Sequence, residues 1–149
     1  MDCLLHCLTV FEVYFVIIGK LMDKDFKKLK TKNILFIDRK TSEELVEYYS
    51  SADICLPLHR DGSVMGIVAE EALACGTPII HSKEIGAKNS PAIYKVSHSG
   101  KDVSKALRKY IELPKKRKRE ISKIAREFAK RYYSDDAWKN KYIKYYLGN

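Results

Sequence analysis

The sequence predicts an α/β fold in which helices cover both faces of a parallel β-sheet. Five short runs rich in β-branched and aromatic residues have the length of strands, and helical patterns separate them in strict alternation. The runs are almost continuously apolar, as in strands buried on both faces. Because alternating strands and helices form right-handed crossovers, all the strands are expected to be parallel. The expected strands are 13–18, 33–37, 53–58, 78–82 and 92–96.

Helix start and stop signals place the helices between and after these strands. Thr41 or Ser42, followed by Glu44, forms a capping box that opens a helix over 41–52. Gly76 is expected to end a helix as a left-handed cap, with Pro78 just beyond it. Pro114 is suited to begin another. The remaining expected helices are 23–30, 66–75, 101–112, 114–131 and 135–146.

Length and composition are those of one folded domain. The chain has 149 residues, 46% of them hydrophobic, which is enough for a single ordinary core. We expect a Rossmann-like core over 13–130 and a C-terminal helix within 131–149.

The positive charge is concentrated in the last third of the chain. Residues 101–149 contain 16 Lys and Arg and 6 Asp and Glu, a net charge of +10, whereas the whole chain carries +9. The run KKRKRE at 115–120 is either a solvated helix face or a contact for an anionic partner. No nucleic-acid-binding module accompanies it, so nucleic acid is not an expected partner.

The four cysteines show no spacing typical of a disulfide framework or a zinc site. Cys3, His6 and Cys7 share one helical face but lack a fourth ligand. We therefore expect a reducing cytoplasm and no metal. The apolar start at 1–19 contains Asp2 and Glu12 and is too interrupted for a spanning helix, so any membrane contact would be peripheral.

The stretch HRDGSVMGIVAEEALACGTPII at 59–80 is the strongest functional signal. Ligands of parallel sheets bind beyond the carboxyl ends of the strands, where this loop is expected to lie. Gly62 and Gly66 allow a ligand to approach the backbone, and the amides and dipole at the start of the following helix favour a phosphate.

Four segments together resemble the C-terminal, donor-binding domain of family 4 glycosyltransferases, which have the two-domain GT-B architecture. The likeness covers almost all of residues 13–146, and its motifs occur in the family's order. The segments are VYFVIIGK, NILFIDRKTSEELVEYYSSADICLPL, GIVAEEALACGTPIIHS and YSDDAWKNKYIKYY, the last being similar to the family's closing helix.

The resemblance implies transfer of a hexosyl group from a nucleoside diphosphate sugar with retained anomeric configuration. The donor is a substrate, and no cofactor is implied. Glu71 would accept hydrogen bonds from the ribose hydroxyls. Ile37 and Arg39 would frame the base. Backbone amides of Met65, Gly66, Ile67 and Val68 would face the diphosphate and sugar. No catalytic residue is assigned.

Two departures from the family pattern affect this site. The family's first glutamate, eight positions before Glu71, falls on Ser63, and either the carboxylate is absent or Asp61 supplies it. The family's diphosphate-neutralising Arg and Lys are also missing, and the nearest basic residues are Lys20, His59 and Arg60. Glu70 points about 100° away from Glu71 on a helix and is expected to be a surface residue.

The acceptor-binding domain of the family has no counterpart in the sequence. We therefore expect a fragment, or one part of a split enzyme whose other part is a separate acceptor-binding chain or domain. The alternative is a non-catalytic binding or assembly module that uses the basic, aromatic C-terminal helix at a membrane surface or on a partner protein.

Overall fold

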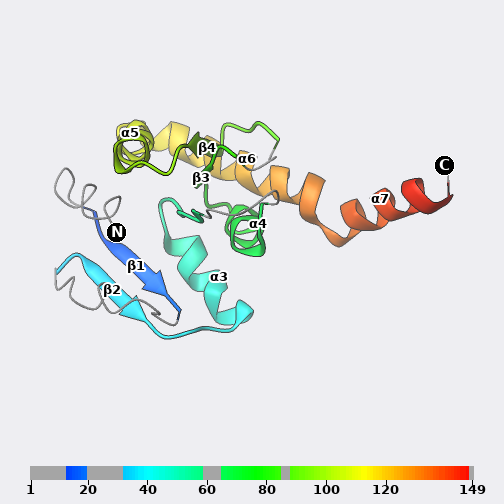
Figure 1. The fold of residues 1–149 in the computed structure, drawn as a ribbon, viewed down its shortest axis with the longest axis horizontal. Helices are drawn as coiled ribbons and strands as arrows, with labels where there is room; N and C mark the ends of the chain where they lie inside the picture. Colours follow the sequence, from blue (N-terminus) through cyan, green and yellow to red (C-terminus); the bar gives the residue numbers. More distant parts are fainter. Residues whose placement is uncertain (1–12, 20–31, 59–64, 85–87, 148–149) are drawn as a thin grey trace.

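The computed structural model describes residues 13–19, 32–58, 65–84 and 88–147, and it confirms the α/β class (Figure 1). The strands are β1 (Phe15–Ile18), β2 (Ile34–Ile37), β3 (Ile79–Ser82) and β4 (Ile93–Val96). The helices are α3 (Ser42–Ser51), α4 (Ile67–Ala74), α5 (Gly100–Ile111), α6 (Lys115–Tyr133) and α7 (Asp135–Leu147). The expected helix at 23–30 lies outside the described residues.

The strands are parallel, as predicted, but within the described residues they form two small sheets. β1 pairs with β2 in the register Phe15↔Ile34, and β3 pairs with β4 in the register Ile79↔Ile93. No described strand joins the two pairs. The described strands are thus parallel, as predicted, but they do not form one continuous sheet.

The prediction of a full strand at 53–58 is wrong. Only Cys55 pairs there, through a parallel bridge to Ile79. The Cys55 N–H donates to the Pro78 carbonyl and the Ile80 N–H donates to the Cys55 carbonyl, both at 2.9 Å. Pro57 has no N–H to donate, so the ladder cannot continue past it in the same way. The segment extends the β3–β4 sheet by a single residue.

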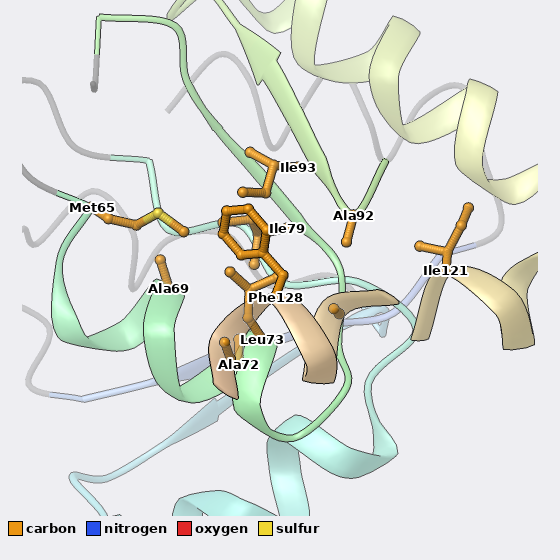
Figure 2. Close-up of a cluster of buried hydrophobic side chains, with 11 residues drawn as sticks. Met65, Ala69, Ala72, Leu73, Ile79, Ala92, Ile93, Ile121 and Phe128 are labelled. Atoms are coloured by element: carbon orange, nitrogen blue, oxygen red, sulfur yellow. The ribbon is translucent and has the colours of Figure 1, made fainter. Parts of the chain in front are cut away.

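Helices cover both faces of the β3–β4 sheet, as the sequence predicts. Ile79 and Ile93 point into a core cluster formed with α4 and α6 (Figure 2). Ile80 and Val96 point to the opposite face, where they pack with residues of α5. Alternate residues of a strand face opposite sides, so β3 is buried on both.

Two structural features fix the ends of α4. At its start, Gly66 is the N-cap with φ 77° and ψ 144°. At its end, Gly76 has φ 85°, its N–H donates to the Leu73 carbonyl, and the Thr77 N–H donates to the Ala72 carbonyl, both at 2.9 Å. This is the Schellman arrangement that a glycine cap favours, and it confirms the predicted stop.

The first turn of α3 confirms the predicted capping box. The Thr41 hydroxyl accepts from the Glu44 N–H at 3.3 Å, and a Glu44 carboxylate oxygen accepts from the Thr41 N–H at 2.9 Å. Because α3 packs against α4, this cap fixes the start of a helix that borders the candidate site.

The C-terminal helices carry the positive charge and the exposed rings. The basic run at 115–120 lies in the first turns of α6, mostly exposed, whereas the helix buries Ile121, Ala125, Phe128 and Ala129. Beyond it, α7 extends away from the rest of the domain (Figure 1). None of the described helices is long and apolar enough to cross a membrane.

We predict that Gly76→Ala lowers the free energy of unfolding by about 1 to 3 kcal/mol. A side chain at φ 85° is strained, and its Cβ would also lie 2.9 Å from the Ser122 hydroxyl of α6. Urea denaturation measures the change. Gly100→Ala in the first turn of α5, where φ is not positive, is the control and should have little effect. Equal effects of the two substitutions would contradict this explanation.

Candidate functional site

The start of α4 presents backbone donors at the surface. The first-turn N–H groups of Ile67 and Val68 have no acceptor within the helix. Ile67 is 70% exposed and Val68 is 37% exposed, whereas Met65, which precedes the N-cap Gly66, is buried. An anion placed here meets first-turn amides and the positive end of the helix dipole. The predicted phosphate-binding residues Gly66, Ile67 and Val68 lie at the start of this helix, and their role stays a prediction.

Glu71 lies one turn further along α4 and faces α3. Its carboxylate accepts hydrogen bonds from the Tyr49 hydroxyl at 3.1 Å and from the Ser42 hydroxyl at 3.5 Å. Ser42 is the first residue of α3 and Tyr49 lies two turns later. Two neutral hydroxyls therefore orient the carboxylate without supplying a compensating charge.

The pKa of Tyr49 is raised, chiefly by burial and next by the negative charge of Glu71. The neutral phenol is therefore the form that faces Glu71, and it acts as a hydrogen-bond donor. Tyr49 makes a second contact through its backbone, where its carbonyl accepts a hydrogen bond from the Thr77 hydroxyl. Tyr49 thereby links α3 to the middle of α4, through Glu71, and to the segment that follows α4, through Thr77.

Glu70 and Glu71 face different parts of the structure, as their separation on a helix predicts. Glu70 is half-buried, and burial raises the pKa of its carboxyl group while the charge of Lys141 lowers it. Its own charge raises the pKa of Tyr133. Glu70 thus lies on the side of α6 and α7, although it is less exposed than a surface residue is expected to be.

Ile37 and Arg39 lie where β2 leads into α3. Ile37 is the last residue of β2, and its carbonyl accepts from the Gly19 N–H at 3.0 Å. Arg39 is exposed in the short link to Thr41. Because Ser42 reaches Glu71, this link runs close to the carboxylate.

Several predicted site residues fall outside the described part of the chain. The described residues contain no group of three His, Cys, Asp or Glu that could hold a metal ion. The candidate metal ligands Cys3, His6 and Cys7 lie outside the described part of the chain. The undescribed site residues are Lys20, His59, Arg60, Asp61 and Ser63.

The structure adds site residues that the sequence did not single out. In the sequence, Ser42 is only a candidate residue for the start of a helix. Tyr49 is only one apolar residue in the helical pattern of α3. The position of both beside Glu71 depends on how α3 packs on α4. A second addition is His81, which contacts the Met65 carbonyl from within the core.

The arrangement combines an anion-binding group with a hydroxyl-binding group. Ile67 and Glu71 are one helical turn apart, about 6 Å along the axis. Amides at the start of a helix suit a phosphate, and a carboxylate with lone pairs that can accept further hydrogen bonds suits a pair of hydroxyl groups. A ligand that carries both within a few ångströms would engage them together.

Comparison with known proteins identifies one family. Residues 10–128 match the family described as glycosyl transferases group 1. Among curated proteins, none matches the sequence.

Solved structures share the fold at low sequence identity. The crystal structure of Anabaena Alr3699/HepE in complex with UDP superposes with a TM-score of 0.79 and 17% identity, covering 98% of this chain and 44% of that one. The same protein in complex with UDP-glucose gives 0.72 and 17%, with the same coverage. Sucrose-phosphate synthase from Thermosynechococcus elongatus gives 0.76 and 19%, covering 99% and 42%. The chain thus spans less than half of each.

We predict that the Tyr49 phenol ionises above its ordinary pKa of about 10, and that Glu71→Gln lowers this pKa without restoring the ordinary value. Removing the negative charge removes the second cause of the shift and leaves burial, the larger one. Because the raised pKa favours the protonated folded state, the stability from this group is present below about pH 10 and is lost as pH rises further. NMR titration of the labelled ring carbon measures both values, and an unchanged pKa in the variant would contradict the contact.

Proposed function

Because this chain belongs to the glycosyl transferases group 1 family, we propose that it binds a nucleoside diphosphate sugar at the start of α4 and serves hexosyl transfer with retained configuration. One observation carries the proposal. A carboxylate held by neutral hydroxyls lies one helical turn from the first-turn amides of the same helix. This spacing suits the ribose and the diphosphate of one nucleotide.

Each part of the donor then has a counterpart in the chain. The diphosphate lies at the amides of Gly66, Ile67 and Val68, where the helix dipole stabilises its charge. Glu71 accepts from the ribose hydroxyls, and these charge-assisted hydrogen bonds are stronger than those to a neutral group. The link with Ile37 and Arg39 borders the base. The UDP and UDP-glucose complexes of Alr3699/HepE support a donor of this chemical class.

Complete transfer requires a second half that binds the acceptor. The chain covers only 42 to 44% of the solved structures it resembles. We propose that polypeptide beyond these 149 residues, in the same chain or another, closes over the donor. Such closure excludes water and places the acceptor hydroxyl beside the sugar.

We predict that the protein binds a nucleoside diphosphate and that Glu71→Gln weakens binding by about 1.5 to 3 kcal/mol. Isothermal titration calorimetry with UDP, GDP and ADP measures the affinity and ranks the bases. Glu70→Gln is the matched control, because the same change is made at the neighbouring residue on the other side of the helix. Burial already disfavours the Glu70 charge, so the amide should fold well.

The comparison of the two glutamates separates a site effect from a general one. Loss of affinity confined to Glu71→Gln supports the proposed site. Equal affinity of both variants and the wild type would remove Glu71 from it. Absence of binding by the wild type to all three nucleotides would overturn the proposed function.

We also predict that the 149-residue polypeptide by itself transfers no sugar above background. The proposed site binds the donor, and transfer also needs a surface that positions the acceptor, which we assign to polypeptide beyond these residues. A radiolabelled nucleotide sugar incubated with a panel of acceptors tests this. Efficient transfer to a defined acceptor would contradict the need for a second half.

A second candidate function rests on α7. Trp138, Tyr142, Tyr145 and Tyr146 are exposed, and the rings of Tyr142 and Tyr146 are stacked with centroids 6.0 Å apart. Lys141 lies over the Trp138 ring at 4.9 Å. Aromatic rings beside lysines suit a membrane surface or a protein partner. Flotation with anionic liposomes tests binding to a membrane surface. A protein that binds nucleotide but does not float with the liposomes would favour the donor-binding function alone.

A further inference from the structure

The carbonyl group of Met65 is held from inside the core. Its oxygen lies 2.9 Å from Nε2 of His81, a side chain of β3 that is only 1% exposed. The Met65 side chain is also buried, reaching from the start of α4 towards Ile79 (Figure 2). Met65 therefore joins the core directly to Gly66, the N-cap of the helix that forms the candidate site.

The hydrogen bonds of His81 determine which ring nitrogen carries its proton. The backbone N–H of Ser82 donates to Nδ1 at 2.7 Å, so Nδ1 must be an unprotonated acceptor. In the neutral ring the proton is then on Nε2, and the Met65 carbonyl can only accept it. His81 is thus a donor aimed at one particular peptide group.

The bond from His81 fixes the orientation of the Met65–Gly66 peptide. A trans peptide group is planar, so its C=O and N–H point in opposite directions. With the Met65 carbonyl turned towards the buried imidazole, the Gly66 N–H must point away from it. This places one more amide donor ahead of those of Ile67 and Val68.

The opposite orientation of this peptide is sterically open to the chain. Gly66 has φ 77° and ψ 144°, a conformation that only glycine adopts readily. Rotating the Met65–Gly66 peptide by half a turn would change φ of Gly66 to about −100°, which is ordinary extended backbone. The flipped peptide would direct a carbonyl oxygen outward, where a phosphate would be repelled. The core contact, rather than local preference, selects the observed state.

We infer that His81 is a positioning residue for the donor diphosphate, because it locks the Met65–Gly66 peptide with the Gly66 N–H directed at the ligand. This inference rests on the proposed function. His81 does not touch the ligand, and it acts only through the peptide it orients. The chemical group it serves is the diphosphate, and the nucleoside is bound independently of it.

Two amide substitutions separate the hydrogen bond of His81 to the Met65 carbonyl from its hydrogen bond with the Ser82 N–H. The side-chain nitrogen of glutamine reaches the position of Nε2, so His81→Gln keeps the donor to the Met65 carbonyl and loses the acceptor for Ser82. Asparagine is shorter and takes the position of Nδ1, so His81→Asn keeps the acceptor and loses the donor. Both variants are neutral, and each retains one of the two bonds.

The decisive measurement is the affinity of each variant for UDP and for uridine, by calorimetry or NMR titration. We expect His81→Asn to weaken UDP binding about tenfold, the equivalent of one good hydrogen bond, and to leave uridine binding unchanged. His81→Gln should retain UDP affinity within about threefold. The Gly66 amide resonance should shift on UDP addition in the wild type and in His81→Gln, and should not shift in His81→Asn.

Two further variants complete the test. Gly66→Ala disfavours the observed φ with His81 intact, so it should reproduce the selective loss of UDP affinity even if His81→Asn fails to fold. Tyr133→Phe removes the hydrogen bond from the Tyr133 hydroxyl to the Met65 sulfur (3.1 Å) and leaves the peptide alone, so UDP affinity should persist.

The possible results distinguish this inference from the proposed function. If the wild type binds UDP while His81→Asn and His81→Gln bind it equally, the positioning role is wrong and the donor site stands. If both variants lose UDP and uridine to the same extent, His81 has only a structural role and the inference is again wrong. If the wild type does not bind UDP, GDP or ADP, both proposals fail together.

Discussion

The packing of α4 against α6 is the contact on which the candidate site depends. Ala69, Ala72 and Leu73 are fully buried on the α4 side, and they meet Ala125 and Phe128 on α6. Alanines let the two helices approach closely, so the orientation of α4 has little freedom. The same contact leaves the first turn of α4 at the surface and turns Glu71 towards α3. The amides and the carboxylate are therefore placed by apolar packing, without direct contacts between them.

The described polar groups around α4 orient the site residues without neutralising the charge of Glu71. Glu71 receives only hydroxyl groups among its described hydrogen bonds, so its charge is oriented and still available to a ligand. His81 likewise orients a group of the site without adding charge to the core, because its neutral ring holds the Met65 carbonyl by a hydrogen bond. Both residues orient groups of the candidate site, Glu71 through its own carboxylate and His81 through the Met65 carbonyl.

The two small sheets divide the domain into a well-packed part and a more exposed part. β3 and β4 are covered on both faces, whereas β1 and β2 expose apolar side chains such as Val16 and Leu35. The β1–β2 pair contacts the rest through Val13 and Phe15, which pack on the α5 side of the core. The candidate site is built mainly on the well-packed part, with α3 as the element that brings the β2 link to it.

The sequence by itself determined most of the described helices and strands and the start of α4 as the place where a phosphate is proposed to bind. Capping signals at Thr41 and Gly76 are local, so the ends of α3 and α4 were predictable, and Glu71 followed from its motif. Tertiary structure alone decided what surrounds them. Tyr49 reaches Glu71 from 22 positions away and His81 reaches Met65 from 16. Neither contact has a local pattern, because the first depends on how α3 packs on α4 and the second on how β3 lies against the start of α4. The sequence shows Pro57, which limits the ladder after Cys55, but the tertiary structure decided that Cys55 pairs with Ile79.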